Sequence, residues 1–315
     1  MFTLIKKAKS KIALENKQLF SYNCVSLSEY SCLTDENKKS PFCIYDKEIY
    51  NELYPKYPTS IRKANFLISK AFINDIEQEI LMILNFLIYA TSKQIFDYLL
   101  LKKYHVTKEC VSKKLVKLKE KSFVRQLEFK TIETTSSFKV YLLGKYGIRF
   151  LKNNRNFVRT PVKLPTYKMK KILAASQLCL YIAAENEVIF RISDALKLFI
   201  DKNNNNFIAL RPSALISSEN ECAMIEAVRR NSNWENELSE KLERYYFFIT
   251  NNNCFCSYLG KNPHLTLLCE DFEHINQVRK IVPDKFLADI NVLFTYDRAF
   301  HEHNNCKFFT AKQYI

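Results

Sequence analysis

The chain of 315 residues is 47% hydrophobic and 26% charged, the balance of a folded globular protein with about two domains. Its 3 glycines are too few for the glycine-rich loops with which P-loop NTPases and Rossmann enzymes bind phosphate. Residues 1–170 hold 32 Lys and Arg against 15 Asp and Glu, whereas residues 171–315 hold 16 against 18. The first half therefore has the charge that attracts a polyanion such as nucleic acid.

The first elements along the chain are helices. Residues 1–70 show weak periodicity, and we expect a basic N-terminal extension there. Apolar residues then recur at helical spacing over 75–88, which predicts an amphipathic helix. Two further helices are predicted over 92–103 and 108–122, and a threonine stands before each of them in the N-cap position.

A hairpin follows the three helices. Residues 123–143 predict two strands on either side of a polar turn at 134–137, and a short helix is predicted over 146–154. Three helices followed by a two-stranded hairpin is the order of a winged helix, whose third helix enters the major groove of DNA while the hairpin tip reaches the adjacent backbone. We therefore expect a winged-helix DNA-binding domain over residues 71–154.

The third helix and the hairpin supply the expected DNA contacts. On the helix, the face opposite the apolar stripe is basic, and lysines act mainly as point charges on phosphate. The side chains expected to bind DNA are Lys108, Ser112, Lys113, Lys117 and Lys119 of the helix and Lys130 and Lys139 of the hairpin. Many winged helices contact proteins instead, so a protein–protein interaction module is an alternative function.

A basic segment with two prolines, residues 155–168, is expected to link this domain to a second one over 169–315. The order of the second domain is helix, three strands, helix, strand, helix, strand, which predicts a mixed α/β sheet with helices against it. The predicted helices cover 169–185, 235–249 and 272–282, and the predicted strands cover 188–195, 207–218, 222–230, 264–271 and 289–297.

Three short motifs in this second domain are the hairpin sequence RPSALI at 211–216, the strand MIEAV at 224–228 and the helix EKLERYYFF at 240–248. Together with the preceding winged helix they resemble the replication-relaxation proteins of plasmids and conjugative elements in Gram-positive bacteria. The resemblance covers residues 75 to about 297. It implies a fold of the second domain like that of restriction endonucleases, whose active site uses a hairpin Asp, an acidic residue and a Lys on the next strand, and two metal ions.

The chain departs from that active site at two positions. Ser213 stands where the hairpin Asp is expected, and Val228 stands where the Lys is expected, although the strand acid is present as Glu226. Because Mg²⁺ is usually held by one or two carboxylates together with substrate phosphates, we expect no metal site, no cofactor and no enzymatic activity. Lys241 on the next helix could replace the missing ammonium group, so Glu226 and Lys241 remain the pair to watch, and a metal-dependent nuclease using Glu226 is an alternative.

We therefore expect a double-stranded DNA-binding protein of a mobile element, acting in plasmid replication, conjugative transfer or its transcriptional control. Replication or transfer proteins and a second copy of the chain, forming a homodimer, are the candidate protein partners. The longest apolar run, residues 80–90, is interrupted by Asn85 and is too short to span a bilayer, so we expect no membrane partner and a cytoplasmic location.

Overall fold

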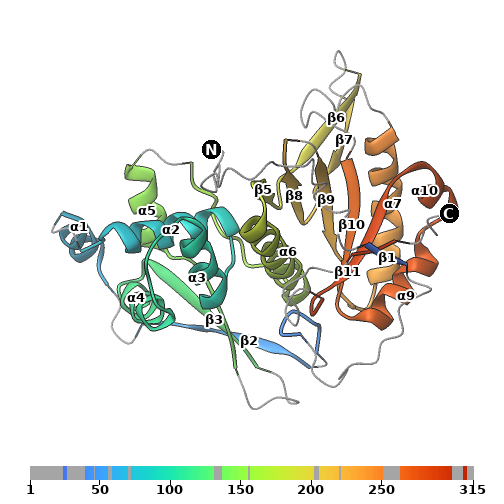
Figure 1. Ribbon diagram of the computed structural model, residues 1–315. Helices are drawn as coiled ribbons and strands as arrows, with labels where there is room; N and C mark the ends of the chain where they lie inside the picture. Colours follow the sequence, from blue (N-terminus) through green and yellow to red (C-terminus); the bar gives the residue numbers. More distant parts are fainter. Residues whose placement is uncertain are drawn as a thin grey trace. The chain divides into compact units, whose positions relative to one another are not determined.

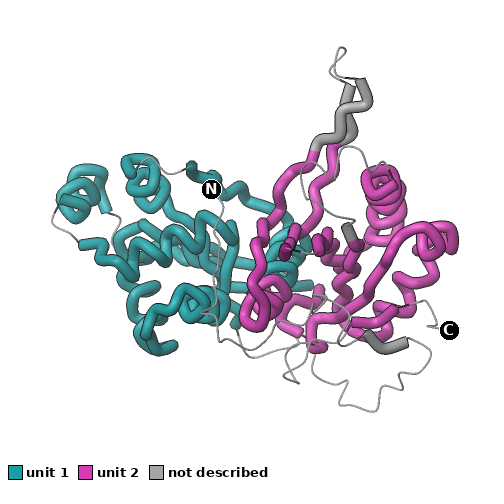
Figure 2. Tube along the Cα trace, turned by 45° about the horizontal axis from the view of Figure 1, so that its top comes forward, with its two compact units in different colours: residues 1, 45–176 teal, residues 2–44, 177–315 magenta. Residues whose placement is uncertain are grey.

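The computed structural model shows a mixed α+β protein (Figure 1). It divides into two compact units, which Figure 2 colours separately: unit 1 contains residues 1 and 45–176, and unit 2 contains residues 2–44 and 177–315. The residues that the structure describes are 24–26, 40–45, 47–55, 59–69, 72–130, 137–154, 157–201, 206–219, 221–250, 263–299 and 308–310.

Unit 1 combines helices with an antiparallel sheet. Within its described residues, the sheet has three strands in the order β2-β3-β4. The strands are β2 (Ile49–Leu53), β3 (Val124–Lys130) and β4 (Phe138–Leu143), and the helices are α1 (Ile61–Ser69), α2 (Asp75–Leu87), α3 (Ser92–Leu101), α4 (Lys108–Glu120) and α5 (Lys145–Asn153). The predicted order of three helices, a hairpin and a short helix is confirmed in α2 to α5.

The predicted helix starts are confirmed in detail. The side chain of Thr91 accepts a hydrogen bond from the backbone N–H of Gln94, and Thr107 accepts one from Cys110. Such bonds satisfy N–H groups that have no partner inside the helix. On α4 the buried positions are Val111, Leu115 and Leu118, which is the stripe that the spacing predicts.

The segment expected to be a linker is bound to unit 1. Asn85 of α2 donates from its side-chain amide to the carbonyl of Phe157 and accepts from the backbone N–H of Arg159, both at 2.8 Å. Further along, the amide of Gln94 donates to the carbonyl of Leu173 at 2.7 Å. These bonds extend unit 1 into the next helix, α6 (Thr166–Glu185), and the division between the units falls inside that helix.

A buried ion pair also holds the start of α6 to the sheet of unit 1. Lys170 is fully buried, and its Nζ lies 2.6 Å from a carboxylate oxygen of Glu48, just before β2. The same ammonium lies 4.9 Å from the ring centroid of Tyr45 and 6.0 Å from that of Phe129. Because a buried charge is costly unless it is paired, the basic residue at this position is tied to the carboxylate that precedes β2.

Unit 2 contains a mixed sheet. In the described part of the chain it has seven strands in the order β1-β12-β11-β10-β9-β8-β5, in which β9, β10 and β11 are parallel and β5, β8 and β9 are antiparallel. The strands are β1 (Cys24–Ser26), β5 (Ile189–Ile192), β8 (Ala214–Ser217), β9 (Cys222–Ala227), β10 (Pro263–Cys269), β11 (Val292–Tyr296) and β12 (Phe308–Thr310). A separate pair is formed by β6 (Leu196–Asp201) and β7 (Asn206–Leu210).

Three strand predictions for this unit are wrong. The run predicted as one strand over 207–218 is two strands, β7 and β8, which belong to different sheets. The strand β6 was not predicted, and the strand predicted as the last, over 289–297, is followed by β12. The N-terminal segment 1–70 also contributes strands to both units, with β1 pairing to β12 and β2 pairing to β3. Short strands carry little periodicity, and their partners lie far away in sequence.

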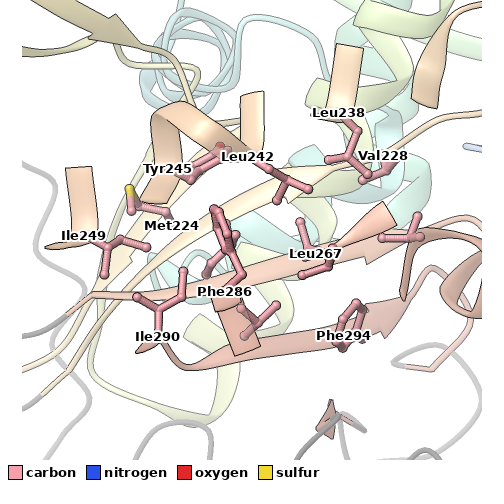
Figure 3. Close-up of a cluster of buried hydrophobic side chains, with 14 of the residues drawn as sticks. Met224, Val228, Leu238, Leu242, Tyr245, Ile249, Leu267, Phe286, Ile290 and Phe294 are labelled. Carbon is pink, nitrogen blue, oxygen red and sulfur yellow. The ribbon is translucent and has the colours of Figure 1, made fainter. Parts of the chain in front are cut away.

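The main core of unit 2 lies between the sheet and the helices α7 (Trp234–Thr250), α9 (Phe272–Ile281) and α10 (Asp284–Asp289). Met224 and Val228 from the β9 segment pack with Leu242 of α7, Leu267 of β10 and Phe294 of β11, as Figure 3 shows. Glu226 lies two residues from Met224 and two from Val228, and residues two apart in an extended chain share one face of the sheet. The side chain of Glu226 is therefore on the same face as theirs. The position of the predicted site residue is therefore set by the packing of α7 on the sheet.

Candidate nucleic-acid interface and buried polar clusters

The charge of the molecule belongs to one unit. Unit 1 carries 26 Lys and Arg against 11 Asp and Glu, and unit 2 carries 22 of each, so the formal net charge of +15 resides in unit 1. Unit 2 as a whole is formally neutral. A nucleic-acid interface is therefore expected on the helices and hairpin of unit 1.

A buried carboxylate decides which lysines of α4 are available. Glu77 of α2 is 1% exposed, and its Oε1 accepts hydrogen bonds from the Nζ of Lys114 at 2.9 Å and of Lys117 at 3.1 Å. Its Oε2 accepts from the backbone N–H of Asn74, which completes a capping box at the start of α2. Burial acts to raise the pKa of Glu77, but the hydrogen bonds from the two lysines outweigh it and lower that pKa.

Lys117, expected on the DNA-facing side, is thus committed to the fold. Besides its bond to Glu77, its Nζ donates to the carbonyl of Phe72 at 3.0 Å and lies 4.1 Å from the centroid of the Phe72 ring. The helical periodicity of the sequence predicts that Lys117 faces outward, because periodicity gives only the angle of the Cα atom around the helix axis. A long, flexible lysine can turn back along its helix toward a buried charge.

The other expected residues of α4 lie toward solvent. Lys108, Ser112 and Lys113 are exposed, and Lys119 is half-buried. The Nζ of Lys108 lies 5.8 Å from the ring centroid of Phe96 on α3. The exposed face of α4 therefore combines two lysines and a serine hydroxyl, together with Val116, which is 48% exposed.

The hairpin residues Lys130 and Lys139 are also exposed, at the ends of β3 and β4 that adjoin the turn. Lys130 lies 3.3 Å from a carboxylate oxygen of Glu128, and Lys139 is the residue opposite Glu128 in the antiparallel register. The pKa of Glu128 is lowered by a hydrogen bond from Ser137 and by these two lysines. Except for Ser137, the predicted turn lies outside the described residues.

In unit 2 the structure brings together the residues singled out around Glu226. The Oε2 atom of Glu226 lies 2.6 Å from the Nζ of Lys241, 2.9 Å from the hydroxyl of Tyr245 and 3.4 Å from the Oγ of Ser213. Ser213 Oγ also accepts from the backbone N–H of Ala227 at 3.1 Å. Tyr245 was not anticipated, although it stands four residues after Lys241 and so shares its face of α7.

This cluster is closed and contains one carboxylate. Glu226 is 1% exposed, and burial together with Glu226 raises the pKa of Tyr245 well above its usual value, so that the phenol donates to the carboxylate. Val228, which occupies the expected Lys position, packs into the hydrophobic cluster. Across the described residues, no group of three or more His, Cys, Asp and Glu side chains is placed to hold a metal ion.

Sequence reasoning missed a second polar cluster in unit 2. It lies where the parallel strands β9, β10 and β11 end, because charged residues follow each strand within two residues. The fully buried Arg229 lies 2.7 Å from Asp297, and Arg230 donates to Asp271 at 2.9 Å and, from its backbone N–H, to Glu270 at 2.9 Å. Charged residues at the ends of three buried strands were the signal that could have predicted this cluster.

Burial shifts the proton equilibria of this cluster in opposite directions. Burial is the main cause that raises the pKa of Asp297 to about 7, with Glu270 adding to the effect and Arg229 opposing it. Burial and the two positive charges of Arg230 and Arg229 lower the pKa of His274 to about 3. The folded protein therefore favours a proton on Asp297 and disfavours one on His274.

Comparison with protein-family models, with curated proteins and with solved structures finds no match for this chain. None of the described helices has the length and apolar character that crossing a membrane requires.

Replacing Lys117 should affect stability, whereas replacing Lys113 should not. Lys117→Gln removes one of the two ammonium groups that pair with the buried Glu77, and because Lys117 is 39% exposed we expect a loss of only about 1 kcal/mol in the free energy of unfolding. Lys113→Gln should stay within about 0.5 kcal/mol of the parent protein. Urea unfolding of both variants checks this, and equal stabilities would contradict the assignment of Lys117 to the fold.

In the polar cluster of unit 2, two opposing pH dependences of the free energy of unfolding should cancel, and single substitutions should make each of them measurable. Between about pH 4 and 6.5 the unfolded chain carries a proton on His274 and none on Asp297, while the folded chain carries the reverse. The two contributions to the slope of stability against pH therefore cancel. Asp297→Asn leaves only the depressed pKa of His274, so stability relative to the parent should rise with pH by up to about 1.4 kcal/mol per unit.

The matched variant His274→Gln should tilt the profile the other way. It leaves only the raised pKa of Asp297, whose contribution to stability is lost as pH rises toward about 7. Urea unfolding at several pH values between 4 and 7 measures both slopes against the parent protein. Two variants with the same slope would show that these residues do not titrate as described.

Proposed function

We propose that this protein binds double-stranded DNA through unit 1, with the exposed face of α4 in the major groove and the β3–β4 hairpin against the adjacent backbone. The order of α2, α3, α4 and the hairpin is that of a winged helix, in which these two elements have those roles. The observation that carries the proposal is the confinement of the whole net charge to the unit that contains this arrangement. We propose that unit 2, which is neutral, is the part of the chain that binds another protein or a second copy of the chain.

The composition of the α4 face favours contacts with the DNA backbone over the reading of bases. Lys108 and Lys113 are exposed point charges, and Ser112 can donate to or accept from a phosphate or a base edge. Asn and Gln usually read A, and Arg or Lys reads G. Of these residue types α4 has only Lys, which acts mainly as a point charge on phosphate. We therefore propose that binding is driven by charge and only weakly selective for sequence.

The biological setting is proposed from the resemblance to replication-relaxation proteins. It favours a role on a plasmid or conjugative element, in replication, transfer or transcriptional control. The order α6, β5, β8, β9, α7, β10 supports the restriction-endonuclease-like part of that resemblance, with Ser213 and Glu226 meeting at the hairpin. A protein–protein interaction module is the alternative that a lack of DNA binding would favour.

Metal-dependent cleavage is the second candidate function, because Glu226, Lys241 and Ser213 do come together. Their contacts favour a structural role. Both the ammonium group and the Tyr245 phenol bond to the same carboxylate oxygen of Glu226, and among the described residues no group of three or more His, Cys, Asp and Glu side chains is placed to hold a cation. We therefore propose that this cluster holds α7 to the sheet in a protein that is not an enzyme.

DNA affinity should depend steeply on salt and on the exposed lysines of α4. With about six phosphate contacts, we expect a loss of affinity of roughly a thousandfold between 50 and 200 mM salt. The double variant Lys108→Gln and Lys113→Gln should bind more weakly and reduce the slope of log K against log salt by about 1.8, since each contact contributes about 0.9. Fluorescence anisotropy with a short labelled duplex measures both quantities.

The matched control removes two exposed basic residues from unit 2, Arg244→Gln and Lys285→Gln, which changes the net charge equally. It should retain the affinity and the salt slope of the parent protein. Equal losses in the two double variants would mean that only the net charge matters, and would remove α4 as the binding face.

The parent protein should not cleave DNA. Incubation of supercoiled plasmid with Mg²⁺ or Mn²⁺ should leave it intact, because the cluster around Glu226 supplies a single buried carboxylate. Agarose gels, with a restriction enzyme as the positive control, provide the measurement. Nicking by the parent protein that disappears in Glu226→Gln would establish the nuclease function instead.

A further inference from the structure

A second basic surface of unit 1 lies on α5, the helix that follows the hairpin. Lys145, Arg149 and Lys152 occur at positions i, i+4 and i+7, and all three are exposed. This spacing puts them along one side of the helix. The other side, which holds Tyr146 and Leu151, is buried. We call the three exposed residues the α5 stripe.

The α5 stripe differs from α4 in how its charges are balanced. On α4, Lys114 and Lys117 pair with the buried Glu77. The sequence of α5, KYGIRFLKN, has no acidic residue, and neither has IRKANFLIS, the sequence of α1, which contacts α5. Arg62 and Lys63 of α1 are also exposed. The two helices therefore present basic side chains without a carboxylate from their own sequences.

Close packing fixes the direction in which the stripe faces. A Cβ atom on Gly147 would lie 2.3 Å from the carbonyl oxygen of Phe123, and one on Gly144 would lie 2.4 Å from that of Ser122. Any larger residue would push α5 away from the chain that leads into β3. The hydroxyl of Tyr146 in addition donates to the carbonyl of Thr59 at 2.6 Å. These contacts fix the backbone of α5, and with it the side of the helix on which the stripe lies.

The stripe and the face of α4 belong to separate parts of unit 1. Figure 1 shows α5 and α4 on opposite sides of α2, and α5 contacts α1, α2 and β3. A DNA segment that lies along α4 is therefore not placed to reach α5 without bending around the unit. The DNA contacts proposed for α4 and the hairpin do not use the basic residues of α5.

We propose that the α5 stripe binds the phosphate backbone of a second duplex segment, so that one copy of unit 1 holds two pieces of DNA. This inference rests on the proposed function for the first segment at α4. Lys145 and Lys152 are separated by about 10 Å along the helix axis, at 1.5 Å per residue. Over that length one strand of B-DNA presents about three phosphates, at 3.4 Å per nucleotide. Three exposed cations on a rigid helix match this spacing.

The partner is DNA because the α5 stripe offers charge, and none of the apolar side chains of α5 is exposed: Tyr146, Phe150 and Leu151 are buried. An interfacial membrane helix exposes apolar residues beside its basic ones. The adjoining α1 does expose Ile61 and Phe66, so the proposed DNA contact is confined to the three residues of α5. Phosphate contacts by Lys and Arg require no base recognition, so the second segment is bound regardless of its sequence. Linking two duplex segments is then a property of the single chain.

A bridging assay tests the proposal. A biotinylated duplex is fixed to beads, and a fluorescent duplex of unrelated sequence is added with the full-length protein at low salt. The parent protein should capture the fluorescent duplex. The triple variant Lys145→Gln, Arg149→Gln and Lys152→Gln should lower capture at least tenfold, while its anisotropy-measured affinity for one short duplex changes less than threefold. The control triple Arg244→Gln, Lys280→Gln and Lys285→Gln, in unit 2, should capture like the parent.

The outcomes separate this inference from the proposed function. Undiminished capture by the α5 triple variant overturns the inference and leaves DNA binding at α4 intact, as would occur if two copies of the chain bridged the duplexes. Loss of single-duplex affinity in the α5 variant but not in the Lys108 and Lys113 variant supports a phosphate site on α5 and contradicts α4. No DNA binding by the parent overturns both. In one last outcome, the parent protein binds anionic vesicles and the α5 variant does not, while the variant still captures the fluorescent duplex. That result would assign the stripe to a membrane surface and overturn the inference.

Discussion

The packing of α4 against α2 in unit 1 depends on the buried carboxylate of Glu77. Glu77 closes the N-terminal capping box of α2 with one oxygen and accepts hydrogen bonds from two lysines of α4 with the other. A charge at this depth is tolerated only when it is paired, so the start of α2 and the middle of α4 are held together. The same pairing ties the ammonium group of Lys117 to Glu77, although its side chain is 39% exposed, and leaves Lys108 and Lys113 to solvent. The interaction that orients α4 thus also selects its exposed residues.

Unit 2 also contains buried carboxylates, which must be paired or protonated. Two of its buried carboxylates have partners in their own unit: Glu226 accepts from Lys241 and Tyr245, and Asp297 accepts from Arg229. A carboxylate whose oxygen already accepts from an ammonium group and a phenol is poorly suited to bind a cation. The geometry of the hairpin brings Ser213 to Glu226, yet what meets there is a hydroxyl and not a second acid. Charge is balanced internally in unit 2 and remains in excess on the surface of unit 1.

The two units differ in net charge. The excess of basic residues in unit 1 lies on at least two helices, and α4 and α5 present their exposed residues from different parts of the unit. The backbones of both helices are held by close contacts, α4 through Glu77 and α5 through the close approach of Gly147 to Phe123. Exposed cations on a fixed helix can release counterions from a polyanion that binds them. These are the two surfaces that we propose bind DNA.

Local pattern in the sequence determined the helices α2 to α7, the N-caps Thr91 and Thr107, the β3–β4 hairpin and the concentration of charge in the first half. These features depend on neighbours within a few residues or on composition. Only the tertiary structure decided that residues 1–70 supply strands to both units, that Lys117 serves Glu77 while Lys113 does not, and that charged residues gather at the ends of β9, β10 and β11. Each of these depends on groups brought together from distant parts of the chain, because strand pairing and the burial of charge are settled by contacts that no local periodicity encodes.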